Sequence, residues 1–198
     1  MRKIMLRDYK IIVLPFDKKI NDLTEREAKD FFNWFLNITP KRLNILKETI
    51  RKYDKRIAVK LNYSPNSLLY LGTWFSKNVK ARKRTKQEIK REQATLVQFP
   101  GVKAEDWTLT EETFSLCFDV GIYFASIFLK RFKTIEWTYI TKQKNNIDRN
   151  WPLLRGFRVN MNPIQLIITS IYGILDGTYD TKHLRKLYSI WINELKKR

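Results

Sequence analysis

The stretch FSLCFDVGIYFASIFL, residues 114–129, decides how this chain folds. Its only charged residue is Asp119, and apolar side chains recur on every side of the helix that it would form. A helix that is hydrophobic all round is buried. The stretch is shorter than the roughly 20 apolar residues that span a bilayer. It therefore predicts the central helix of a soluble core.

Residues at both ends and in the middle support this helix. Thr110 and Glu111 suit its start, where a capping hydroxyl and an acid are favourable, and Lys130 suits its end. Within it, Gly121 and Ala125 are four residues apart and share one face. Two small side chains on one face predict that a second element approaches closely there.

The rest of the chain predicts further helices. At five places a residue that can cap a helix, often followed by proline, precedes apolar side chains at helical spacing. These places are Thr24, Thr39-Pro40, Ser64-Pro65, Asn162-Pro163 and Thr181. Because proline is accepted at the first position of a helix, the helix from Thr24 is expected to stop near Asn37 and a new one to begin at Thr39.

Short extended segments complete the prediction. Residues 135–141 alternate and predict a strand, and residues 152–159 predict its partner. Residues 9–16 fit either an edge strand or an extended arm, because periodicity alone leaves both open. Brief extended pieces are also expected at residues 57–61 and 96–99. The predicted fold is mainly α with a small β element (α+β), in a single domain spanning residues 1–198.

The chain is strongly basic, with a formal net charge of +19 over 198 residues and a pI near 10.0. Such a field attracts nucleic acid, acidic proteins and anionic lipid heads without choosing among them. A lysine-rich coding bias gives the same number with no partner at all.

Residues 77–92, here called the basic stretch, hold the densest charge. Glu88 and Glu92 are its only acids, and it is expected to form an exposed helix extension or a loop. Its cations form either a solvated face or the surface that binds a partner: Lys77, Lys80, Arg82, Lys83, Arg84, Lys86, Lys90 and Arg91.

Catalytic and cofactor signatures are absent from the sequence. His183, the only histidine, excludes a histidine pair on zinc and is expected at the surface. No glycine-rich phosphate loop occurs, and no cofactor or metal is expected. Glu27 and Glu88 each precede a lysine by two residues, as a metal-dependent nuclease would require, but such spacing is common in a highly charged chain. Cys117, the only cysteine, leaves no partner for an internal disulfide and favours a cytoplasmic location.

Asp119 and Tyr123 are the remaining candidates, because they lie four residues apart on the central helix. A carboxylate in an apolar helix must be paired, hydrogen-bonded or protonated. The pair is either a buried functional site or a structural contact, in which an arginine such as Arg149 or Arg155 neutralises Asp119.

Three aromatic segments together resemble a known set of sequences. They are FFNWF (31–35), YSPNSL (63–68) followed by WF (74–75), and SLCFDVGIYFA (115–125) followed by IEWTY and NWPLL…GF. In this order, over about residues 24–175, they resemble a family of uncharacterised bacterial cytoplasmic proteins. The resemblance implies a fold class and no specific activity. Relatives carry an acid shortly after the tyrosine of the DVGIY motif, where this chain has Ala125-Ser126.

Two hypotheses follow from these residues. The first is a non-enzymatic binding protein, related to immunity or defence, whose basic surface docks on an acidic protein; the analogy is with small immunity partners of bacterial toxins. The alternative is a protein that binds nucleic acid without sequence preference. A metal-dependent nuclease is a third and weaker reading.

Overall fold

The computed structural model describes residues 9–96, 101–142 and 145–195. As predicted, the fold is mainly helical with a small β component, which consists of two two-stranded sheets; the sequence analysis did not expect the first of them, which pairs residues 81–83 with 107–109. The elements in order are a 3₁₀ turn Ile20–Asp22, α1 Glu25–Tyr53, α2 Lys55–Ala58, α3 Ser67–Asn78, β1 Ala81–Lys83, α4 Lys86–Thr95, β2 Trp107–Leu109, α5 Glu111–Arg131, β3 Glu136–Thr138, β4 Leu153–Arg155, α6 Pro163–Leu175 and α7 His183–Asn193.

Helix α5 is the buried centre of the fold, as its sequence predicts. Every residue from Ser115 to Phe128 is buried, and the hydroxyl of Thr110 caps the helix by accepting a hydrogen bond from the backbone N–H of Thr113. Among the described residues, α5 is the one helix long and apolar enough to cross a membrane, and most of it is buried inside the protein. That burial is typical of the core helix of a soluble protein.

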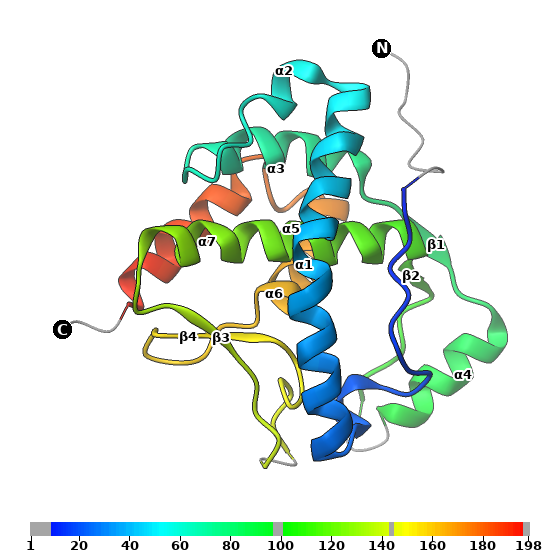
Figure 1. Ribbon diagram of the computed structural model, residues 1–198. Coiled ribbons are helices and arrows are strands. Elements are labelled where there is room, and N and C mark those ends of the chain that lie inside the picture. The colour runs from blue at the N-terminus through cyan, green and yellow to red at the C-terminus, as the bar shows by residue number, and fades with distance from the viewer. Residues whose placement is uncertain (1–8, 97–100, 143–144, 196–198) are drawn as a thin grey trace.

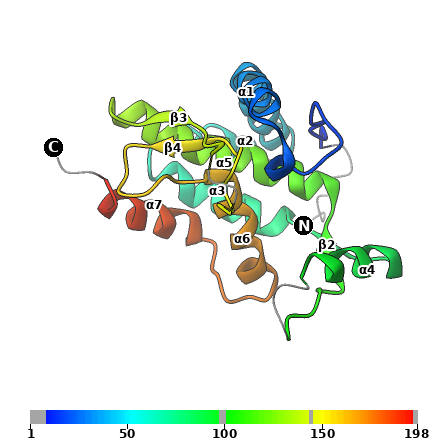
Figure 2. The ribbon, with the colours of Figure 1, turned by 90° about the horizontal axis from the view of Figure 1, so that it is seen from below.

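The other helices surround α5. Figure 1 shows α1 crossing α5, and Figure 2 shows α5 lying between α1 and α6. Helices α3 and α7 contact each other and complete the larger hydrophobic cluster on the same side of the core. The smaller cluster joins α1, α5 and the start of α6. Both hydrophobic clusters therefore contain buried residues of α5.

Gly121 allows the close contact between α5 and α6. A Cβ atom at this position would lie 2.9 Å from the Cα of Ile164 and 3.0 Å from the carbonyl oxygen of Pro163. The small face predicted from the sequence is thus where the first turn of α6 approaches the backbone of α5.

The predicted break near Asn37 is wrong, because α1 continues through Pro40 for 29 residues. Proline removes the N–H that the carbonyl of Leu36 would otherwise accept. Leu36 lies on the exposed side of α1, and the hydroxyl of Thr39 donates to the carbonyl of Phe35 at 2.8 Å. Buried side chains on both sides of the proline, such as Leu46, hold the helix on the core.

The two sheets are antiparallel pairs of three-residue strands. β3 and β4 lie inside the predicted segments and pair with Trp137 opposite Leu154, and β4 ends before Gly156, which has φ +115°. Residues 9–16 form an extended arm without a strand partner among the described residues. The extended piece expected at 57–61 is wrong, since α2 covers its beginning. The piece expected at 96–99 lies almost wholly outside the described residues.

The basic stretch is neither one helix extension nor one loop. It contains the end of α3, strand β1 and most of α4. Thr85 and Glu88 form a capping box at the start of α4, which is a strong local start signal. β1 then pairs with β2, directly before α5, so the basic stretch is attached to the beginning of the central helix.

Candidate functional site

The basic stretch neutralises part of its own charge. The guanidinium of Arg82 donates to both carboxylate oxygens of Glu88, at 3.0 and 2.7 Å, and Arg84 lies 3.5 Å from Glu92. Both acids of the stretch are therefore used internally. Its other cations have no ion-pair partner among the described residues: Lys77, Lys80, Lys83, Lys86, Lys90 and Arg91.

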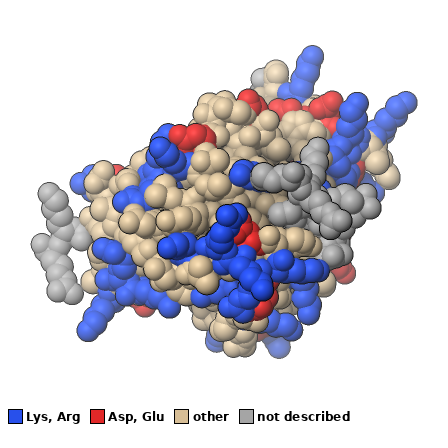
Figure 3. Space-filling model, turned by 90° about the horizontal axis from the view of Figure 1, so that it is seen from above, with Lys and Arg blue, Asp and Glu red and all other residues tan. Residues whose placement is uncertain are grey.

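A second basic group lies at the end of α1 and on α2. Residues from Lys47 to Lys60 make up this group. In the view of Figure 3, Lys and Arg side chains are interspersed with acidic side chains and uncharged surface. The ammonium groups of Lys47 and Lys130 lie 4.4 and 3.9 Å from the ring centre of Tyr63. Burial and the nearby charge of Lys130 lower the pKa of Lys47. Part of the positive charge in both basic groups is thus neutralised by acids nearby.

Asp119 has a structural partner that the sequence analysis missed. Its carboxylate oxygens each accept a hydrogen bond of 2.7 Å from Arg42, and the hydroxyl of Tyr9 donates to it as well. The expected partners make other contacts: Arg149 donates to the carbonyl of Thr141, and Arg155 pairs with Glu136.

This carboxyl is fully buried, and burial raises its pKa to about 6, against the lowering effect of Arg42 and Tyr9. Arg42 is buried because it follows the core residue Phe35 by seven positions and precedes Leu46 by four, so all three share one helix face. That spacing is the signal in the sequence that could have identified it.

Tyr123 belongs to a different contact. Its hydroxyl donates to the hydroxyl of Ser67 at 2.8 Å and accepts the backbone N–H of Tyr63 at 3.0 Å, and the two tyrosine rings stack 4.8 Å apart. Asp119 and Tyr123 are therefore both buried but do not hydrogen-bond each other. Each joins α5 to another segment, which favours the structural reading of the pair.

The acids considered for a nuclease also have structural partners. Glu27 accepts hydrogen bonds from Thr24 in a capping box and pairs with Lys18 at 2.6 Å, and Glu88 has the equivalent role in α4. No group of three or more histidine, cysteine or acidic side chains that could hold a metal lies among the described residues. The expectation that His183 is a surface residue is only partly right, since its ring stacks on Tyr179 at 3.8 Å and lies 3.1 Å from the Ser170 hydroxyl.

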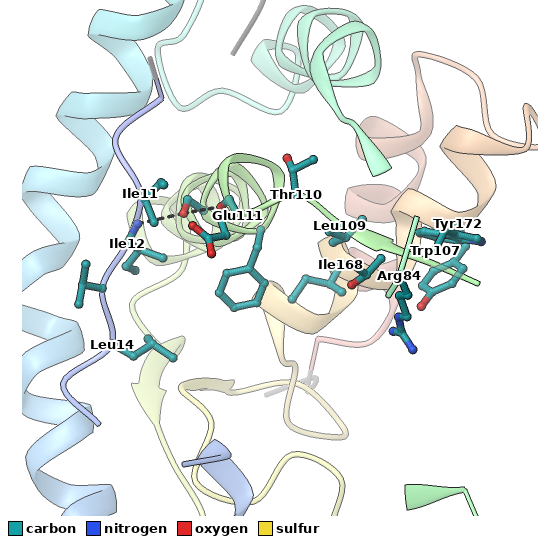
Figure 4. Close-up of a pocket in the computed structure, with 14 residues that line it drawn as sticks. Ile11, Ile12, Leu14, Arg84, Trp107, Leu109, Thr110, Glu111, Ile168 and Tyr172 are labelled. Atoms are coloured by element: carbon teal, nitrogen blue, oxygen red, sulfur yellow. Dashed lines mark hydrogen bonds between the residues drawn. The ribbon is translucent and has the colours of Figure 1, made fainter. Parts of the chain in front are cut away.

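A groove of about 550 Å³ lies beside the basic stretch (Figure 4). One wall is the arm at residues 11–14, and the opposite wall is β2 with the first residues of α5. Phe114 and Ile168 supply apolar surface between the walls, and Tyr172 packs against Trp107 at 4.8 Å. The groove is therefore mainly apolar.

The arm that forms one wall is firmly attached. Tyr9 is hydrogen-bonded to Asp119, Arg42 donates to the carbonyl of Lys10 at 2.9 Å, and the backbone N–H of Ile12 donates to the hydroxyl of Ser115 at 2.9 Å. Val13, directly after these contacts, stays accessible, with 79% of its surface exposed. The Asp119 contacts thus position this wall of the groove.

The strand on the other wall has one unpaired edge. In the β1–β2 pair, the backbone N–H of Arg84 donates to Asp106 and that of Thr110 donates to Lys80. Alternation in an antiparallel pair then directs the backbone groups of Trp107 and Leu109 away from β1. No backbone partner for these two residues is found among the described residues.

Arg84 joins the groove to the basic stretch. It lines the groove, its side chain is only 15% exposed, and its Nη1 atom makes no hydrogen bond of good geometry within the described part of the chain. Glu111 adds an acid to the lining. Sequence analysis found the cations of this region but not the groove, because the arm and β2 are about 95 residues apart in the chain.

Comparison with known proteins adds no relative. No family model, no curated protein and no solved structure matches the chain.

Proposed function

We propose that this protein is a non-enzymatic binding protein that docks on an acidic protein partner, in an immunity or defence role in the cytoplasm. The observation that carries the proposal is the apolar groove with an unpaired strand edge, continuous with the basic stretch through Arg84. An extended segment of the partner would place apolar side chains in the groove and pair with the free edge of β2.

Charge gives the expected chemistry of that segment. Lys83 and Lys86 are exposed at the same end of the molecule, so acidic residues flanking the apolar anchor would face unpaired cations. The apolar lining and Glu111 disfavour a phosphate backbone in the groove itself. These features support the protein partner over the nucleic-acid alternative.

Selection from a random peptide display library tests this proposal. Enriched peptides are expected to carry Asp or Glu beside branched or aromatic residues. The charge reversal Lys83→Glu and the groove variant Ile168→Asp should each lower the affinity for a selected peptide at least tenfold. The control Lys133→Glu, which reverses the charge of another exposed lysine, should not. Enrichment of basic peptides, or equal loss with all three variants, would contradict the proposal.

The nucleic-acid alternative rests on the net charge of +19 and the two basic groups. It predicts binding to DNA and RNA of any sequence, with affinity falling steeply as salt rises. Binding of a duplex more tightly than any selected peptide, at physiological salt, would favour this alternative.

A further inference from the structure

A second cavity, of about 400 Å³, lies where α5 ends beside α7 and the turn before α3. It shares no residue with the groove. Its polar lining comes from Arg131, Arg185, Tyr188, Ser189 and Asn193, and Pro65 and Ile192 add apolar surface. A volume of this size suits a small ligand.

Tyr188 carries an unexplained polar group in this lining. The residue is only 3% exposed, and its hydroxyl is buried without a hydrogen-bond partner among the described residues. The ring packs against Phe128, 4.7 Å away. A buried hydroxyl without a partner costs stability, so such groups are rare and point to a missing contact.

Two arginines, Arg131 and Arg185, line the cavity together with Tyr188. The guanidinium of Arg185 lies 5.4 Å from the ring centre of Tyr188 and donates to the hydroxyl of Ser189 at 2.6 Å. Burial raises the pKa of Tyr188, whereas the charges of Arg131 and Arg185 lower it, as expected for cations near the oxygen. Neither arginine has a carboxylate partner among the described residues, and no acid lines the cavity.

We propose that this cavity binds a small molecule carrying a phosphate monoester. The two guanidinium groups would supply planar, charged donors that match phosphate oxygens, and the unpartnered Tyr188 hydroxyl would supply a neutral donor. Pro65 and Ile192 would contact the organic part of the ligand. The proposal is independent of the partner proposed for the groove.

Calorimetric titration of the protein with phenyl phosphate, inorganic phosphate and phenol, each in a separate experiment, tests the site. Phenyl phosphate is expected to bind most tightly, inorganic phosphate more weakly, and phenol not at all. Arg131→Gln and Arg185→Gln should each lower the affinity for phenyl phosphate at least tenfold. Lys133→Gln, which removes an exposed charge two residues from Arg131, should change the affinity less than twofold.

Tyr188→Phe separates a ligand site from a packing role. It deletes only the hydroxyl, so the unliganded variant should be at least as heat-stable as the parent, since the lost group has no partner, while phenyl phosphate binds several-fold more weakly. The proposal is overturned if phenyl phosphate does not bind at about 10 mM. It is also overturned if Tyr188→Phe leaves the affinity unchanged, or if Lys133→Gln weakens binding as much as the arginine variants.

Discussion

At the scale of single residues, the contact between Arg42 and Asp119 is the most consequential. It places an ion pair inside the core, and such pairs are costly to break from one side because a buried charge is left uncompensated. It also connects α1, α5 and the arm, through Tyr9 and the carbonyl of Lys10. A single polar contact between distant segments thereby determines where one wall of the groove lies.

Removing Arg42 should therefore destabilise the protein in a pH-dependent way. Arg42→Ala is expected to lower the free energy of unfolding by about 3–5 kcal/mol at pH 7. Burial already raises the pKa of Asp119 from 3.8 to about 6, and loss of the guanidinium raises it further. A carboxyl with a raised pKa is most favourable to the folded state when protonated, so the loss should shrink as the pH falls from 7 towards 5.

Urea unfolding at several pH values measures this effect. In the parent protein the contribution of this carboxyl should decrease as the pH rises from about 4 to about 6, and the variant should continue to lose stability above that range. Arg51→Ala, which removes an exposed arginine of the same helix, is the control and should change stability by less than about 0.5 kcal/mol. An Arg42→Ala effect that is equal at pH 5 and pH 7 would show that charge is not its cause.

At the scale of elements, the packing of α6 on α5 depends on one missing side chain. The backbone of Pro163 and Ile164 occupies the space where a Cβ of residue 121 would lie. Backbone cannot rotate away as a side chain can, so the two helices would have to separate. The contact of these helices also sets the position of Ile168 and Tyr172 in the groove.

Gly121→Ala tests this contact. Alanine improves helix propensity by about 1 kcal/mol, which alone would stabilise α5. The steric conflict should outweigh this gain and lower the free energy of unfolding by about 1–3 kcal/mol. Thermal and urea unfolding measure the change, and a rise in stability would mean that α6 does not approach as closely as described.

At the scale of the whole molecule, the distribution of charge matters more than its sum. Several cations of the basic stretch and of the second basic group are already paired with acids. If a continuous basic surface bound nucleic acid, the affinity of the protein for DNA would fall steeply as the salt concentration rises.

Because several of these cations are paired with acids, we expect the affinity of the protein for DNA to be weak and to depend only slightly on salt concentration. Duplex DNA titrated between low and physiological salt should lose affinity with a slope equivalent to only a few phosphate contacts, about 3 or fewer. Fluorescence anisotropy at several salt concentrations measures that slope. A slope equal to that of 6–10 contacts would indicate a continuous basic face and favour the nucleic-acid alternative.

The sequence by itself determined the central helix, its caps and most of the surrounding helices. These follow from local rules, since an all-apolar run, a capping box at Thr24 or a proline after Asn162 acts within a few residues of itself. The local rules failed at Pro40, where packing against α5 outweighs the lost backbone hydrogen bond. The two strands predicted within residues 135–159 exist but are shorter than predicted. Their ends depend on pairing between β3 and β4, which the local sequence does not specify.

Only the tertiary structure decided the contacts between distant segments. Asp119 pairs with Arg42 across 77 positions, and the groove brings the arm beside β2. The second cavity likewise joins the end of α5 to α7. Which of many arginines meets a buried acid, and which side chains share a cavity, depends on how helices cross, and a one-dimensional pattern of apolar residues carries no information about that crossing.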